Sequence, residues 1–251
     1  MTSDFLTDLL LVVPHPDDEV FGSGAMLART AARGKAATLT LTRGAAGLTL
    51  GLTTRAGLAD RREGELRAAL ATLGVQDITI LDYQDYVPDA NRGMPEHPGL
   101  VAADHAAVLA AVLDAFDRTR PRAVLTFPPN GANGHPDHCF TNAIVLEAFA
   151  KTSTKPERLY YFASATPFVG PQRPGFLEES EMHARYLAPT HTAAAGAELV
   201  TKLSAMACHE TQALSVLGFM RQHAARLLDE TFHRAYPPVA AGVGMTVVEL
   251  L

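Results

Sequence analysis

Two short segments of the chain concentrate histidine and acidic side chains at a spacing that suits metal chemistry. The first is Pro14-His15-Pro16-Asp17-Asp18-Glu19, and the second is Gly134-His135-Pro136-Asp137-His138. Consecutive acids at the end of a buried strand cost free energy unless a cation offsets their charge. An ordinary polar turn explains one acid of the first segment, but not a histidine together with three acids.

Together the two segments offer the ligands of an open, catalytic metal site. Neutral imidazole and carboxylate suit zinc and also ferrous iron. One histidine from each segment and one Asp supply two nitrogens and one oxygen, and leave a position for water. Zinc lowers the pKa of such a water towards about 7, a spare carboxylate can act as general base, and a spare histidine can stabilise an oxyanion or protonate a leaving group. The spacing leaves open which Asp binds and which acts as base.

The elements that position these segments alternate along the first part of the chain. Strands interleaved with helices of this length predict a Rossmann-like α/β fold, with a mostly parallel sheet covered by helices on both faces. Such sheets carry their sites at the carboxyl ends of the strands, so we expect both segments at one edge. The predicted strands are 9–13, 37–42, 78–81, 123–127 and 159–162, and the predicted helices are 22–33, 58–73, 101–119 and 137–150.

The remainder of the chain is less regular. We expect a single domain over residues 1–251, with a core at about 8–165 and a less regular part at 166–251. Helices are predicted at 177–185, 193–208 and 214–231, and long loops at 85–99 and 164–189. Long loops in compact domains are usually functional or mobile.

Composition excludes several classes of protein. The chain has 251 residues, with 27 acidic against 21 basic side chains, which argues against nucleic acid or an anionic membrane as the main partner. Its two Cys cannot build a four-thiolate zinc site. The apolar run Leu9 to Val13 is far shorter than the roughly 20 residues of a spanning helix. We therefore expect a soluble, cytoplasmic protein, provided that the chain is complete.

The motif pair resembles the LmbE-like (PIG-L) family of zinc-dependent N-acetylglucosaminyl deacetylases, which includes deacetylases of mycothiol and bacillithiol synthesis and of chito-oligosaccharides. The similarity rests on the two His-Pro-Asp segments and on a helix with Arg62-Glu63-Gly64-Glu65-Leu66 followed by Leu73-Gly74. A weaker match is Lys202 followed by His209-Glu210-Thr211-Gln212. The resemblance covers residues 8–150 well and 198–213 loosely.

The resemblance also implies a role for individual residues. His15, Asp18 and His138 would be the metal ligands, and Asp17 the general base. His135 would be the electrophilic or acidic histidine, oriented by Asp137. Arg62 would bind the sugar hydroxyls or hold the charges of the site, and Asp85 would contact the substrate. We also expect Asn133, which stands at a position that departs from the family pattern, to contact the substrate. Glu19 would orient the loop or the start of the helix, and His209 would either support the site or contact the product.

One position departs from the family pattern. Some members carry a Tyr two residues before the second His-Pro-Asp motif, where this chain has Asn133. Asn donates a hydrogen bond but is not an acid at neutral pH. Tyr186 is a candidate replacement from elsewhere in the chain.

Three functions are consistent with the sequence. The first is a deacetylase of a small N-acetylglucosamine-type substrate, with zinc or, in the cell, ferrous iron as cofactor. The second is an amidase of a thiol–sugar conjugate that uses the same site. The third is a non-catalytic module that binds a sugar or a metal, although a base beside an open metal site argues against it. The resemblance further implies a homo-oligomer, a trimer or a hexamer.

Overall fold

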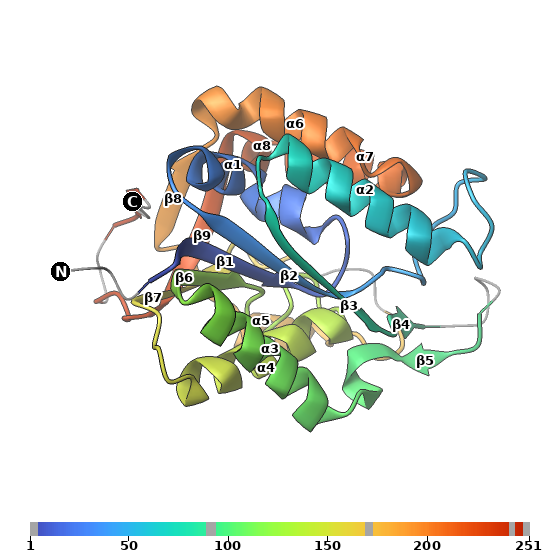
Figure 1. Ribbon diagram of the computed structural model, residues 1–251, viewed down its shortest axis with the longest axis horizontal. Helices are drawn as coiled ribbons and strands as arrows, with labels where there is room; N and C mark the ends of the chain where they lie inside the picture. The colour runs from blue at the N-terminus through green and yellow to red at the C-terminus, as the bar shows by residue number, and fades with distance from the viewer. Residues whose placement is uncertain (1–4, 89–93, 169–172, 241–243, 248–251) are drawn as a thin grey trace.

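A mixed eight-stranded sheet, flanked by helices on both faces, forms the centre of the computed structural model (Figure 1). The structure describes residues 5–88, 94–168, 173–240 and 244–247. The strand order is β10-β8-β9-β7-β6-β1-β2-β3. Its parallel part confirms the predicted strands and consists of β1 (Thr7–Val13), β2 (Ala36–Thr42), β3 (Asp77–Tyr83), β6 (Pro121–Thr126) and β7 (Arg158–Phe162).

Helices cover the two faces of this sheet unequally (Figure 1). One face carries α1 (Asp18–Arg33), α2 (Leu58–Thr72), α6 (Leu199–Ala207), α7 (Ala213–Gln222) and α8 (Ala225–Leu228). The other carries α3 (His105–Thr119), α4 (Pro136–Lys151) and α5 (Glu179–Ala184). Short elements complete the described chain: the hairpin β4 (Tyr86–Val87) and β5 (His97–Pro98), and the 3-10 helices Gly99–Ala102, Gly196–Glu198 and Glu210–Gln212.

Strand β1 shows why the apolar runs of the sequence become buried strands. Successive side chains of a strand point to opposite faces of the sheet. Leu9 and Leu11 pack into the core beneath α1 and α2, whereas Leu10 and Val12 pack into the core beneath α3 and α4. A parallel sheet covered on both faces therefore needs an uninterrupted apolar run, which is what residues 9–13 supply.

The order in which strands are added to the sheet reverses between β1 and β6. These strands are parallel neighbours, but β1 leads into α1 on one face and β6 leads towards α4 on the other. In open α/β sheets this arrangement leaves a crevice at the carboxyl ends of the two strands. Both His-Pro-Asp turns lie there, which confirms that they share one edge of the sheet.

The C-terminal part differs from the prediction. The helix expected at 193–208 begins only at Leu199, because residues 191–194 form β8 (His191–Ala194). The helix expected at 214–231 is interrupted between α7 and α8, and after α8 the chain continues as β9 (Asp229–Tyr236). β9 pairs antiparallel with both β7 and β8, and β10 (Thr246–Val247) adds to β8. Backbone pairing with the sheet thus overrides local helix propensity.

Two further boundaries move by a few residues. The helix expected at 22–33 begins at Asp18, and the helix expected at 101–119 begins at His105 after a 3-10 turn. Among the described residues, no helix is long and apolar enough to cross a membrane.

Candidate active site

The first His-Pro-Asp turn holds Asp17 in an unusual backbone conformation. Asp17 is the N-cap of α1 and has a φ of 106°, in the left-handed region. Its backbone N–H donates to Glu19 Oε2 at 2.9 Å, and Glu19 Oε1 lies 2.6 Å from His209 Nε2. Glu19 and His209 are both buried. These two buried side chains support the turn through the hydrogen bond to the Asp17 N–H. The turn can therefore keep its strained backbone conformation, in which Asp17 lines the cavity.

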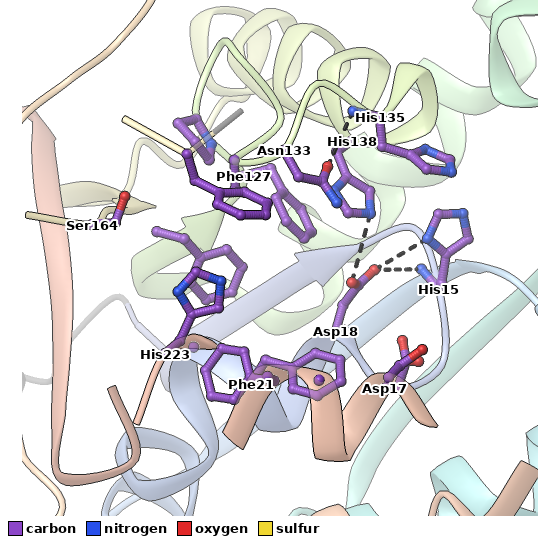
Figure 2. A pocket seen from close by; sticks show the side chains of 18 of the residues that line it. His15, Asp17, Asp18, Phe21, Phe127, Asn133, His135, His138, Ser164 and His223 are labelled. Atoms are coloured by element: carbon purple, nitrogen blue, oxygen red, sulfur yellow. Dashed lines mark hydrogen bonds and ion pairs between the residues drawn. The ribbon is translucent and has the colours of Figure 1, made fainter. Parts of the chain in front are cut away.

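His15, Asp18 and His138 converge at the edge of the sheet (Figure 2). His15 Nδ1 lies 3.4 Å from Asp18 Oδ2, and His138 Nε2 lies 3.6 Å from Asp18 Oδ1. One ligand atom from each of the three residues falls within 4.8 Å of the others. Two nitrogens and one carboxylate oxygen at this separation match an open zinc or iron site.

The outer ring nitrogens of the two histidines are fixed by acceptors. His15 Nε2 lies 3.1 Å from Asp137 Oδ2, and His138 Nδ1 lies 2.9 Å from the carbonyl oxygen of Gly131. Because both partners accept, each outer nitrogen carries a hydrogen, and each inner nitrogen would be free to offer a lone pair to a metal ion held beside Asp18. Carboxylate and carbonyl partners of this kind are what orient metal-binding histidines. The residues therefore fit a divalent metal.

The charges around this cluster favour a cation. Burial alone lowers the pKa of His15, but hydrogen bonds with Asp137 and Asp18 outweigh it and raise that pKa well above its usual value. Burial raises the pKa of Asp18, yet the neighbouring His138 and His15 bring it below the ordinary value. Burial lowers the pKa of His138. An ionised carboxylate thus faces imidazole nitrogens in a buried site.

Asp17 has the properties of a general base. Burial raises its pKa to about 7, against the opposing effect of Arg62, whose guanidinium nitrogen lies 3.3 Å from Asp17 Oδ2. A base works best when its pKa lies near the working pH. The pKa values of the adjacent carboxylates Asp17 and Asp18 are therefore moved in opposite directions, so that Asp18 stays ionised where Asp17 can take up a proton.

The second His-Pro-Asp turn places its residues differently. His135 is the N-cap of α4, and its Nδ1 accepts a hydrogen bond from the Asp137 backbone N–H at 3.1 Å. The Asp137 carboxylate is fully buried, and it accepts hydrogen bonds from the backbone N–H groups of Tyr86 and Leu100. The Asp137 carboxylate thus forms a hydrogen bond with His15, whereas only the backbone N–H of Asp137 forms one with His135. The His135 ring lies 4.7 Å from the His138 ring and faces the same cavity.

The three predicted substrate residues line this cavity as well. The Arg62 guanidinium donates to the carbonyls of Gly44 and Pro16, which fixes it beside Asp17. Asp85 Oδ2 accepts from the Ala46 N–H at 2.8 Å, whereas its buried Oδ1 has no hydrogen-bond partner among the described residues. Asn133 Oδ1 accepts from the His135 N–H, so its side-chain NH₂ is the donor that remains.

The structure thus brings the nine predicted residues together. Eight line one cavity, and Asp137 lies directly behind His15. Tyr186 lines the cavity too, and its hydroxyl donates to the carbonyl oxygens of Ser164 and Ala165. Sequence reasoning missed the other wall, which is formed largely by Phe21, Phe127, Phe162, Phe168 and Phe219. Phe21, which lies three residues after Asp18 on α1, had a local signal, and so did Phe127 and Phe162, which end two predicted strands.

Comparisons with known proteins identify the family of the chain. Residues 10–149 match the family described as PIG-L, GlcNAc-PI de-N-acetylase. The chain belongs to this family, and the expected family and fold are therefore confirmed.

Curated relatives from bacteria carry the name 1D-myo-inositol 2-acetamido-2-deoxy-alpha-D-glucopyranoside deacetylase. One from Catenulispora acidiphila is 39% identical over 152 residues, which are 56% of this chain and 50% of the relative. One from Mycolicibacterium vanbaalenii is 34% identical over 169 residues, which are 63% of this chain and 60% of the relative. The matches thus span only 50% to 60% of these relatives' length.

Solved structures share the fold over nearly the whole chain. A conserved protein of Thermus thermophilus has a TM-score of 0.67 at 24% identity, covering 93% of this chain and 97% of that one. The N,N'-diacetylchitobiose deacetylase of Pyrococcus horikoshii has a TM-score of 0.66 at 17% identity, covering 92% and 84%. A 4-carboxy-2-hydroxymuconate hydratase from Pseudomonas putida has a TM-score of 0.67 at 19% identity, covering 92% and 97%. Because a hydratase shares the fold, function has to be argued from the site.

Proposed function

We propose that this protein is a metal-dependent hydrolase that removes the N-acetyl group from a small N-acetylglucosamine-type substrate. The observation that carries the proposal is the Asp18 carboxylate between the inner nitrogens of two histidines, with the base Asp17 beside it. The family match and the deacetylases among its relatives support this choice of reaction.

His15 Nδ1, Asp18 and His138 Nε2 would hold the metal, and we propose zinc, with ferrous iron as the alternative in the cell. When bound, the ion would supply Lewis acidity that polarises the acetyl carbonyl and eases deprotonation of the attacking water. Asp137 keeps the His15 ring in the orientation that this requires.

The remaining residues move protons and orient the substrate. Asp17 accepts the proton of the attacking water and can return it to the amine that leaves. His135 lies on the opposite side of the cluster, where it stabilises the developing oxyanion or protonates the amine. The Asn133 side-chain NH₂ adds a hydrogen-bond donor but no proton.

Sugar recognition would fall to Arg62 and Asp85. The free Oδ1 of Asp85 is a buried acceptor without a protein partner among the described residues, and a sugar hydroxyl would satisfy it. Arg62 is fixed by two carbonyl oxygens and lines the cavity, and its buried Nε has no hydrogen-bond partner among the described residues. A pair of one acceptor and one cation suits neighbouring hydroxyl groups.

The test is the release of primary amine from a panel of N-acetylglucosamine conjugates. The chain is stripped of metal and then loaded with zinc or ferrous iron. We expect amine release that depends on added metal and that falls sharply in Asp17→Asn. An amidase of thiol–sugar conjugates would act only on panel members with that aglycone. A non-catalytic module would bind metal and sugar tightly without turnover, and a flat result across the panel would refute the deacetylase proposal.

A further inference from the structure

The cavity has two ends with different chemistry. Its volume is about 480 Å³, which is within the usual range for small-molecule sites. One end carries Asp17, Arg62, Asp85 and Gln212, which are all polar. The other end is lined by Phe21, Phe127, Phe162, Phe168, Phe219 and His223, and we call these six residues the aromatic chamber. In Figure 2, Phe21, Phe127 and His223 lie on one side of Asp18, and His15 and Asp17 lie on the other.

The rings of the chamber pack against one another in edge-on and tilted pairs. The ring centroids are 4.9 Å apart for Phe21 and Phe219, 5.4 Å for Phe219 and His223, and 5.0 Å for Phe168 and His223. Phe127 and Phe162 lie 5.1 Å apart. Such pairs stabilise each other's orientation. The chamber is therefore a preformed wall, even though its rings come from α1, from α7 and its C-cap, from the ends of β6 and β7, and from the loop that carries Phe168.

The chamber begins at the proposed metal site. Phe127 stacks on the His138 ring at a centroid distance of 3.9 Å, so an apolar group that enters the chamber lies next to the reacting amide. Burial, together with the nearby Arg226 charge, lowers the pKa of His223, which keeps its imidazole neutral at neutral pH. His223 therefore adds no charge to the chamber, whereas the Arg226 guanidinium, which also lines the cavity, lies 5.6 Å from the centroid of the Phe219 ring.

The packing of the chamber also requires a glycine at position 22. A Cβ added at Gly22 would lie 2.7 Å from a Phe162 ring carbon and 3.2 Å from an Arg226 nitrogen. Gly22 thus lets Phe162 approach α1 closely. Phe168 and Phe219 remain only half-buried, so their apolar surface is in contact with water until something covers it.

We propose that the aromatic chamber binds an apolar, ring-sized substituent of the substrate. This deepens the proposed function and rests on it, because the scissile amide anchors the substrate between the polar end and the chamber. An acetyl methyl group alone is too small to cover several rings. The substituent is carried either at the anomeric oxygen, as an aromatic aglycone, or on the amide, as an acyl group longer than acetyl.

Binding and turnover experiments with matched ligands test this proposal. The ligands are phenyl and methyl 2-acetamido-2-deoxy-D-glucopyranosides, each as both anomers, and N-hexanoyl- and N-acetylglucosamine. Affinities are measured by calorimetry on the full chain with Asp17→Asn and bound zinc, so that no ligand is consumed. We expect the phenyl or the hexanoyl ligand to bind about tenfold or more tightly than its small counterpart. The ligand pair that shows the gain identifies the source of the substituent.

Variants of the chamber locate the preference. Phe219→Ala and Phe168→Ala, each added to that background, should reduce it to about threefold or less, with little change for the small ligands. Leu217→Ala is the matched control, because Leu217 lies on α7 two residues from Phe219 but is 55% exposed and outside the cavity. Phe168 lies on a loop, so its variant is informative even if Phe219→Ala fails to fold.

The outcomes separate this inference from the proposed function. Equal affinities within both ligand pairs, or a preference that survives both Phe variants, would overturn the chamber's role. Amine release from the methyl glycosides by the unsubstituted protein without such a preference would leave the deacetylase proposal standing alone. A preference that depends on the chamber, together with no amine release from any ligand, would support the chamber and refute deacetylation.

Discussion

The two His-Pro-Asp turns contain the same three residues and use them in opposite ways. In the first turn, α1 begins at Asp18, so the N-cap is Asp17 and its carboxylate faces the cavity. In the second turn, α4 begins at Pro136, so the N-cap is His135 and the carboxylate of Asp137 is buried behind His15. In the proposed function, the first turn would therefore supply a ligand histidine and a base. The second would supply a substrate-facing histidine and a supporting acid.

This difference shows that the motif alone does not determine which of its side chains faces the cavity. The residue at which the helix begins also determines it. Pro136 fits the first position of α4, where a missing N–H costs nothing. In the first turn, the Glu19 carboxylate accepts the Asp17 N–H and delays the helix by two residues relative to the motif. The variants that follow test whether the two turns really differ in this way.

Asp17→Asn should have the largest effect on catalysis. We expect kcat to fall by about 10² to 10⁴, the usual loss when a general base is removed, because Asn cannot accept the proton. Zinc content, measured on the purified variant, should stay the same. If the variant instead loses its zinc, Asp17 is a ligand, and the contrast between the two turns breaks down.

His135→Gln should have the next largest effect. We expect kcat to fall by about 10² to 10³, as when one oxyanion donor is lost, with zinc retained. The matched variant at the other turn, His15→Gln, should lose zinc. Metal analysis of both proteins alongside amine release makes the comparison, and equal zinc contents in the two variants would contradict it.

Asp137→Asn should act on the metal and less on the chemistry. Because its carboxylate holds His15 Nε2, we expect zinc affinity to weaken by about 10- to 100-fold in competition with a chelating dye. At saturating zinc, kcat should recover most of its value. Unchanged affinity with a reduced kcat would show that Asp137 acts through His135, as the family resemblance implies.

The smallest expected effects concern stability without metal. Asp17→Gly should raise the free energy of unfolding in urea by about 1 kcal/mol, because Gly adopts a φ of 106° without strain. His135→Ala should lower it by about 1 kcal/mol, because the N-cap acceptor of Asp137 N–H is lost. Changes of the same sign in the two variants would mean that the two N-caps do not differ as described.

Much of the parallel sheet could be predicted, because its signals are local. The run Leu9 to Val13 is apolar without interruption, and the acids that follow it are consecutive in the sequence. The edge that both turns share follows from the parallel direction of β1 and β6. Local patterns therefore sufficed to bring the proposed ligands together.

Other features depend on contacts that the sequence does not display. Ala193 has high helix propensity, yet it lies in β8 because it pairs with Glu230 of β9. The Asp137 carboxylate contacts His15 across 122 residues of chain, a contact that the family resemblance, which linked Asp137 to His135, did not reveal. The aromatic chamber combines rings from distant segments, such as Phe21 and Phe219, and none of these segments has an unusual composition.

Strand β9 also links the site to the far end of the chain. The buried Glu230 accepts hydrogen bonds from the backbone N–H groups of Ala25 and Met26 in α1, and it pairs with the buried Lys202 at 2.8 Å. Glu230 follows Ala25 by 205 residues. During synthesis, the helix that carries Asp18 therefore leaves the ribosome long before the strand that fastens it exists. A nascent chain that ends before β9 therefore contains the residues of the site, but it lacks the Glu230 carboxylate that accepts hydrogen bonds from α1.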